Sequence, residues 1–303
     1  MKTVIVGGPT ATGKTEVAVK IAKEFNGELI NADSRQIYRY LNIGTNKGDI
    51  EENQEGYTIQ NIPIYLLNII DPSERFDLFR YQKLAKEKIK EIRQKGKLPV
   101  IVGGTGLYID SILKGYSLNE EGNIGSKYSR EYLDSLSKPE LQNLVIELNK
   151  KRPESLNDSD WNNPRRLIRF IEKFDIKKPA SKTSELKDFL FLYPKYDWEE
   201  LKNKIDLRVV KMLEDGLIEE TKKVLEMGFN ENDPGLHVMG YREVVQYIKG
   251  EITLDKCIEL IQTAHRQYAR RQKTWFEGKG RGYELIKLDF NNFEPSILNI
   301  VTK

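Results

Sequence analysis

Apolar runs and amphipathic stretches alternate along the first third of the chain. Short apolar runs at Val4–Gly7, Glu28–Ala32, Ile62–Ile70 and Leu98–Val102 predict strands buried on both faces of a sheet. Between them, apolar residues spaced three and four apart predict helices at 14–25, 77–95 and 107–113. Strands and helices that alternate through short right-handed connections predict an α/β fold, with a parallel sheet covered by helices on both faces. The polar, Gly- and Glu-rich segment 44–60 predicts an exposed loop.

The pattern changes after Gly115. Residues 116–187 contain three helical stretches and no convincing strand, and strand composition resumes at Asp188–Tyr193. We therefore expect a core built from residues 1–115 and 188–303, interrupted by an all-helical insertion at 116–187. In the last third, periodic apolar residues predict helices at 198–213, 217–227 and 253–276, followed by a strand at 283–290.

Composition narrows the class of protein. The 303 residues carry 39% hydrophobic and 31% charged side chains, and the net charge is only +3. A nucleic-acid footprint must therefore come from local clusters of basic residues. A single cysteine, Cys257, excludes an intramolecular disulfide, and two histidines make a Cys/His zinc site unexpected. With no signal peptide and no long apolar span, we expect a cytoplasmic protein without a membrane segment.

The first predicted strand leads directly into a phosphate-binding motif. Gly8, Gly13, Lys14 and Thr15 fit the pattern G-x-x-x-x-G-K-[ST], and an amphipathic helix follows. In such a loop the backbone N–H groups and the helix N-terminus surround phosphate oxygens. Lys14 would add a point charge, and the Thr15 hydroxyl would hold Mg²⁺. The motif predicts a site for a diphosphate or a triphosphate.

A small-molecule kinase that binds ATP is the ordinary interpretation of such a loop. Three observations argue against it. Only Asp71 offers a plausible acidic residue for Mg²⁺–ATP at the end of an apolar strand, whereas Asp33 follows the second strand and lies at the mouth of the loop. Basic residues also cluster with aromatic ones around Arg165–Arg169 and Arg266–Lys279, a composition that suits a phosphodiester backbone and unstacked bases.

Seven motifs in order resemble those of bacterial tRNA dimethylallyltransferases. They span residues 3 to about 277 and are Gly8–Thr15, Ala32–Tyr38, Ile43–Thr45, Val102–Tyr108, Asn163–Leu167, Gly240–Glu243 and Tyr268–Phe276. Members of this family transfer a dimethylallyl group from dimethylallyl diphosphate to N6 of adenosine 37, beside the anticodon of tRNAs that read codons beginning with U. The resemblance implies the same reaction here, by a monomer.

The resemblance also assigns roles to residues. The loop, comprising Gly8, Pro9, Thr10, Ala11, Thr12, Gly13, Lys14 and Thr15, would hold the diphosphate of the prenyl donor, with Mg²⁺ at Thr15. Asp33 would act as general base, Thr105 would contact the target nucleotide, and Arg208 would reach the diphosphate. The tRNA would lie against Asp33, Ser34, Arg35, Gln36, Arg165, Arg166, Arg169, Arg270 and Arg271.

Some positions depart from the family pattern. Lys204 stands where arginine is more usual, Asn68 where aspartate is usual, and His265 where a small hydroxyl residue precedes the Tyr268 motif. Ile64-Tyr65 and Lys47-Gly48-Asp49 also differ.

Three other functions stay open at this stage. A metabolite kinase would use ATP, a cytokinin-type enzyme would prenylate a free adenine nucleotide, and an RNA-binding NTPase switch would need γ-phosphate-sensing loops. The long insertion and the basic helix near the C-terminus favour a macromolecular acceptor.

Overall fold

The computed structural model describes residues 2–54, 56–116, 128–174 and 186–295. Contacts divide the chain into two compact units, one formed by Met1–Gly115 with Ser184–Lys303 and the other by Tyr116–Thr183. Within the described part of the chain, no helix is long and apolar enough to cross a bilayer.

One sheet forms the first unit. Its strand order is β3-β4-β5-β2-β6-β1-β7-β8. The strands are β1 (Thr3–Gly7), β2 (Gly27–Asn31), β3 (Ile50–Asn53), β4 (Gly56–Ile59), β5 (Ile62–Tyr65), β6 (Leu98–Gly103), β7 (Phe189–Pro194) and β8 (Ile286–Leu288). From β5 to β8 neighbouring strands are parallel. The central strands β1, β2 and β6 are buried along their whole length, which explains their continuous apolar sequences.

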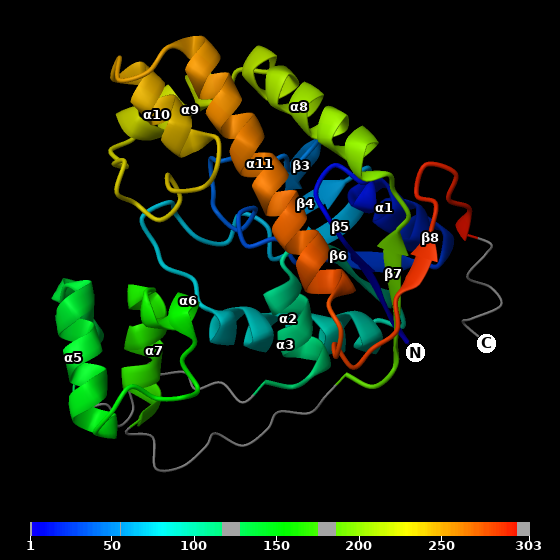
Figure 1. The fold of residues 1–303 in the computed structure, drawn as a ribbon. Coiled ribbons are helices and arrows are strands. Elements are labelled where there is room, and N and C mark those ends of the chain that lie inside the picture. Colours follow the sequence, from blue (N-terminus) through cyan, green and yellow to red (C-terminus); the bar gives the residue numbers. More distant parts are fainter. Residues whose placement is uncertain (1, 55, 117–127, 175–185, 296–303) are drawn as a thin grey trace. The chain divides into compact units, whose positions relative to one another are not determined.

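Helices cover both faces of this sheet (Figure 1). On one face, α1 (Lys14–Glu24) packs Val17, Ile21 and neighbouring apolar residues against β1 and β6. On the other, α2 (Leu78–Gln94) and α3 (Gly106–Leu113) pack against Ile5, Ile30 and Ile101. The predicted α/β class is confirmed.

A helical layer from the C-terminal third completes this unit. It consists of α8 (Trp198–Glu214), α9 (Leu217–Glu226), α10 (Tyr241–Ile248) and α11 (Leu254–Glu277). The last of these, α11, runs alongside α8 (Figure 1). The short α10 was not predicted, and β8 is shorter than the predicted strand at 283–290.

Two expectations for the sheet are wrong. Residues 44–60 are not an exposed loop, because β3 and β4 form an antiparallel hairpin that joins β5. The sheet is therefore mixed, since strands joined by a tight hairpin must run antiparallel. The strand expected over 62–70 ends at Tyr65, because Leu66 and Asn68 take positive φ angles of 60° and 53°.

In the second unit the described elements are helices. They are α4 (Arg130–Ser135), α5 (Lys138–Asn149), α6 (Asp158–Trp161) and α7 (Pro164–Phe174). Leu141 and Val145 of α5 pack with Leu167, Ile168 and Ile171 of α7 in a small apolar core. The residues 117–127 and 175–185, which the prediction also assigned to the insertion, lie outside the described residues.

Candidate active site

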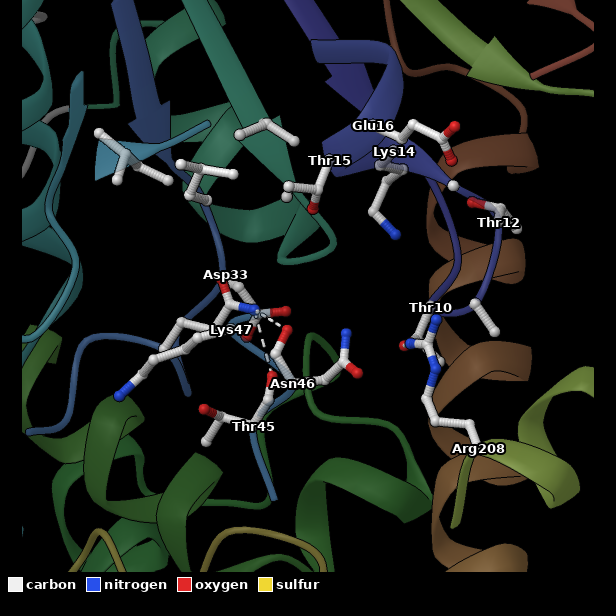
Figure 2. Close-up of a pocket in the computed structure, with 17 residues that line it drawn as sticks. Thr10, Thr12, Lys14, Thr15, Glu16, Asp33, Thr45, Asn46, Lys47 and Arg208 are labelled. Atoms are coloured by element: carbon white, nitrogen blue, oxygen red, sulfur yellow. Dashed lines mark hydrogen bonds between the residues drawn. The ribbon is translucent and has the colours of Figure 1, made fainter. Parts of the chain in front are cut away.

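A cavity of about 230 Å³ lies where β1, β2 and β6 end. Because parallel strands bring their carboxyl ends to one edge, the three following segments meet there. Figure 2 shows the side chains that line this space, with Lys14, Thr15 and Asp33 pointing into it. The lining residues are Thr10–Glu16, Asp33, Gln36, Thr45, Asn46, Lys47, Ile59, Ile64, Val102, Gly103 and Arg208.

The loop between β1 and α1 has the geometry of a phosphate-binding loop. Gly13 has a φ of 78°, and Gly8 has a φ of 147° with the place of its missing Cβ only 2.6 Å from Cδ of Pro194. Both positions therefore require glycine. At the start of α1, Gly13 provides no side-chain cap. The first N–H groups of the helix therefore remain available for an anion.

Two half-buried cations, Lys14 and Arg208, lie at this loop. Nζ of Lys14 donates to the carbonyl of Pro9 at 2.5 Å, and Nη1 of Arg208 on α8 donates to Oγ1 of Thr10 at 3.1 Å. Burial, and then the charge of Arg208, lower the pKa of Lys14 to about 7, although Asp33 opposes the shift. Burial also lowers the pKa of Arg208. Neither cation forms an ion pair among the described residues, so the pocket favours an added anion.

Asp33 is held in a tight turn just beyond β2. Its backbone N–H donates to Oδ1 of Asn31 at 3.0 Å, and its own Oδ1 accepts from the N–H of Arg35 at 3.0 Å. The carboxylate thus has a local structural contact and also lines the cavity with Lys14 (Figure 2). A carboxylate in this position can orient a substrate N–H and accept its proton.

Thr105 connects β6 to the turn that carries Asp33. Its Oγ1 accepts from the N–H of Ser34 at 2.9 Å and lies 3.2 Å from Oγ of Ser34. Thr105 is not among the residues that line the cavity. The structure therefore brings Thr105 next to Ser34, and its predicted contact with a nucleotide stays a prediction.

Gln272, which sequence analysis did not single out, ties the two Gly-rich loops together. From α11, its Oε1 accepts from the N–H of Thr10 at 2.9 Å, and its Nε2 donates to the carbonyl of Gly104 at 2.9 Å. Gln272 is only 4% exposed. A side chain at Gly104 would collide with it, since a Cβ there would lie 2.0 Å from Nε2 of Gln272. In the sequence, only the family motif at 268–276 indicated that Gln272 could have a role in the site.

Aromatic and basic side chains stack beside Asp33. The guanidinium carbon of Arg35 lies 3.3 Å from the ring centre of Tyr268, and that of Arg271 lies 5.9 Å from the same ring. Burial and the nearby Asp33 raise the pKa of Tyr268, which therefore stays neutral. The predicted tRNA contacts Ser34, Arg35, Gln36 and Arg271 thus come together around the turn.

The hairpin that was predicted as a loop supplies one wall of the cavity. Ile59 on β4 and Ile64 on β5 make this wall apolar. Lys47, only 2% exposed, also lines it. Its Nζ donates to the carbonyl of Tyr38 and to Oδ1 of Asn42 and of Asn68. Lys47 and Ile59 were missed as lining residues because the polar composition of 44–60 resembles a surface loop, and Ile64 was expected only as part of a buried strand.

Thr15 and the acidic residues of the pocket fit the requirements of Mg²⁺. The Thr15 side chain lies at the start of α1 and points into the cavity together with Asp33 (Figure 2). Mg²⁺ prefers oxygen ligands and usually takes only one or two from protein, completing its shell with substrate phosphates and water. The predicted role of Thr15 is therefore compatible with this pocket.

The remaining predicted tRNA contacts are surface residues. Arg165, Arg166 and Arg169 are exposed on α7 in the second unit, where Arg166 pairs with Asp160. Arg270 is exposed on α11, with its guanidinium 5.8 Å from the ring centre of Trp198. Lys204 is also exposed and does not line the cavity.

Asp71, the residue that a kinase interpretation would need, lies elsewhere. Its Oδ1 pairs with Nη1 of Arg39 at 3.0 Å, and it is not among the residues that line the phosphate pocket. The pocket is lined by Asp33 instead, across from the loop, together with Glu16 at the start of α1.

Comparisons with known proteins agree with this site. Residues 36–279 match the family model IPP transferase. The chain is 40% identical to a tRNA dimethylallyltransferase of Thermoanaerobacter sp. (98% of this chain, 96% of that protein). It is 39% identical to the protein of the same name from Acetivibrio thermocellus (98% and 95%).

Two solved structures resemble the fold. The tRNA isopentenylpyrophosphate transferase of Bacillus halodurans has a TM-score of 0.70 and 31% identity, covering 99% of this chain and 94% of that one. A eukaryotic dimethylallyltransferase acting on tRNA has a TM-score of 0.79 and 26% identity, covering 100% and 80%. Together with the phosphate loop and the Asp33 turn, these matches identify the chain as a member of the IPP transferase family.

Proposed function

We propose that this enzyme transfers the dimethylallyl group of dimethylallyl diphosphate to N6 of adenosine 37 in tRNA, releasing diphosphate. The observation that carries the proposal is one cavity in which Lys14 and Arg208, which form no ion pair among the described residues, are combined with the Asp33 carboxylate and an apolar wall. The relatives are named for this transfer. By the same analogy, the acceptors are tRNAs that read codons beginning with U.

The two ends of the cavity suit the two parts of the prenyl donor. Its polar end, formed by the phosphate loop and Arg208, suits the diphosphate. The apolar side chains of Ile59, Ile64 and Val102 suit the five-carbon chain. When the allylic C–O bond breaks, its electron pair leaves with the diphosphate, and the fixed charges of Lys14 and Arg208 stabilise the new negative charge.

Asp33 would act on the acceptor. The lone pair of adenine N6 is delocalised into the ring, which makes the amine a poor nucleophile. A carboxylate hydrogen-bonded to N6–H orients the amine and accepts its proton as the new C–N bond forms. The target base must first leave the anticodon-loop stack.

Mg²⁺, when bound, would neutralise charge on the departing diphosphate. Thr15 would hold it, and the loop and Lys14 would orient the diphosphate around it. We further propose that the protein works in the cytoplasm as a monomer, which light scattering of the purified protein would test.

The test of the proposed function uses two acceptors, tRNA and AMP, with ATP offered separately, and one matched pair of variants, Asp33→Asn and Asp33→Ala. Purified protein is incubated with Mg²⁺, dimethylallyl diphosphate and unmodified tRNA carrying A36-A37-A38. The RNA is then digested, and the masses of its nucleosides are measured by mass spectrometry. We expect prenyl-adenosine from the wild type. In Asp33→Asn, whose Oδ1 can still accept from the N–H of Arg35, the rate should fall by about 10²- to 10⁴-fold.

Other results would favour the alternatives. Turnover of ATP without prenyl-adenosine would indicate a kinase, and product on AMP but not on tRNA would indicate a cytokinin-type enzyme. If Asp33→Asn retained the wild-type rate while Asp33→Ala lost it, Asp33 would hold the turn and would not be the base.

A further inference from the structure

His265 is a buried polar side chain that the proposed reaction does not use. It lies on α11, 5% exposed, and its Nε2 is buried without a hydrogen-bond partner among the described residues. Leaving such a nitrogen unpaired costs free energy, so its persistence needs an explanation.

The position of His265 on the helix directs it toward the candidate site. Residues 265, 268 and 272 are spaced by three and four, so they share one face of α11. Tyr268 on this face stacks with Arg35, and Gln272 holds the loops at Thr10 and Gly104.

Two arginines are linked to this face of α11: Arg35 stacks on Tyr268, and Arg208 donates to Thr10, whose N–H is held by Gln272. Burial, and then the guanidinium groups of Arg35 and Arg208, lower the pKa of His265 to about 3. The imidazole is therefore neutral at physiological pH and can present an N–H as a donor. Asp206 of α8 is already engaged by both carboxylate oxygens with Arg266, the neighbour of His265 in the sequence, at 2.7 Å.

The neighbouring arginines have spare donors. Arg208 makes one hydrogen bond, to Thr10, and Arg35 contacts the ring of Tyr268. A guanidinium carries five N–H donors, and neither arginine has an ion pair among the described residues. Two guanidinium groups and one unpartnered imidazole nitrogen are the donor set that suits a phosphate group.

We propose that Arg35, Arg208 and His265 form a second anion-binding cluster beside the phosphate loop, and that a substrate phosphate group accepts a hydrogen bond from His265. The phosphate comes either from the prenyl diphosphate or from the RNA backbone next to the target adenosine. That the phosphate belongs to one of these two substrates rests on the proposed function. His265 acts here as a ligand-binding residue of the substrate complex.

The experiment follows the two histidines of the full-length protein by NMR after ¹⁵N-histidine labelling. His237 is exposed and serves as an internal reference. Two probes are added separately with Mg²⁺: inorganic pyrophosphate and an anticodon stem-loop RNA. We expect one of them to shift the ring nitrogens of His265 but not those of His237. A shift with pyrophosphate assigns the phosphate to the donor, and a shift with RNA alone assigns it to the acceptor.

Binding measurements on variants provide the second readout. His265→Leu should weaken binding of the same probe by about 10- to 100-fold, as expected for one hydrogen bond to a charged group. His265→Gln, whose amide N–H reaches near the place of Nε2, should recover most of the loss. His237→Leu is the matched control, and thermal unfolding verifies that each variant is folded.

Two results would overturn the proposal. One is that neither probe shifts His265 in the wild-type protein, a measurement that does not depend on any variant. The other is that folded His265→Leu binds both probes as tightly as the wild type. Because pyrophosphate binding needs no prenyl transfer, a shift of His265 without prenyl-adenosine formation would refute the proposed function and retain the anion cluster.

Discussion

At the scale of single residues, the pocket removes two cationic side chains, Lys14 and Arg208, from the water that would stabilise their charge. Loss of hydration in the pocket lowers the pKa of both Lys14 and Arg208, and that of Lys14 falls to about 7. An anionic substrate would return the stabilisation that burial removes. The protein without substrate therefore loses some stability by holding Lys14 and Arg208 in the pocket, and the bound anion restores it.

Lys14 should make binding of the prenyl diphosphate dependent on pH. Bound diphosphate keeps the lysine protonated, whereas in the free protein it loses its proton above about pH 7. The affinity should therefore be at its maximum below pH 7, and above pH 7 it should fall by up to about tenfold per pH unit. Calorimetric titrations between pH 6 and 9 measure this.

Lys14→Arg is the control for this prediction. Arginine keeps its charge across the same range, so the variant should show only the pH dependence of the ligand's own ionisation. Equal slopes for the wild type and Lys14→Arg would contradict a role for the Lys14 proton.

At the scale of elements, α11 joins parts of the site that lie far apart in the sequence. Gln272 connects the loop after β1 with the loop after β6, and Tyr268 holds Arg35 in the turn after β2. The helix is itself fixed to α8 by Arg266 and Asp206. The positions of the phosphate loop and of Arg208 are thus coupled through one helix.

Gln272→Leu should loosen the phosphate loop. The N–H of Thr10 and the carbonyl of Gly104 would lose their partners, at a cost of about 1–3 kcal/mol in unfolding free energy. The KM for dimethylallyl diphosphate should also rise. Urea unfolding and steady-state kinetics measure the two effects. The control is Gln267→Leu, which replaces an exposed glutamine on the same helix and should leave the unfolding free energy within about 0.5 kcal/mol of the wild type. Equal losses of stability in the two variants would show that Gln272 does not hold the two loops together.

A second element, α10, fixes the segment that leads into β3. The fully buried Tyr241 accepts from the N–H of Gly44 at 3.0 Å and donates to Oε1 of Glu220 at 2.5 Å. Glu220 also accepts from the N–H groups of Asn42 and Ile43. These contacts hold the chain just before Thr45–Lys47, which line the cavity.

Tyr241→Phe should therefore destabilise the protein by about 1–3 kcal/mol, because the half-buried Glu220 carboxylate and the buried N–H of Gly44 lose a shared partner. Hydrogen exchange should increase at 42–47. Tyr247→Phe, on the same helix and only partly buried, serves as the comparison. Unchanged exchange at 42–47 in Tyr241→Phe would show that Glu220 alone holds the segment.

At the scale of the whole molecule, the chain separates a complete phosphate pocket from a helical unit. All residues that line the pocket belong to the unit formed by Met1–Gly115 and Ser184–Lys303. The helical unit has its own small core and exposes Arg165 and Arg169 on α7. This division predicts that donor binding and tRNA binding can be altered independently.

Replacing both Arg165 and Arg169 by alanine should weaken binding of tRNA while pyrophosphate binding stays unchanged. If both contact phosphates, the slope of log affinity against log salt should decrease by about 1 for each arginine. Fluorescence titrations from low to moderate salt measure this slope. Lys150→Ala, exposed at the end of α5, is the matched control. An unchanged slope in the double variant would remove α7 from the tRNA interface.

Much of the site could be predicted because its parts are local in sequence. The phosphate loop is a continuous segment between a strand and a helix, so its glycines and Lys14 define it without distant contacts. The placement of Asp33 also followed from a general rule, since the carboxyl ends of parallel strands share one edge of the sheet. Family motifs then indicated the reaction.

The rest depended on contacts between distant segments. The polar hairpin at 50–59 gave no apolar alternation, and only its pairing with β5 made it part of the sheet. Gln272 lies 262 positions from Thr10, and no local pattern relates the two. The sequence by itself determined the α/β class, the phosphate loop and the family. Only the tertiary structure decided the apolar wall of the cavity, the burial of Lys47 and His265, and the contacts of Gln272 on α11 with the two Gly-rich loops. The reason is that burial and hydrogen-bond partners are set by which distant segments pack together.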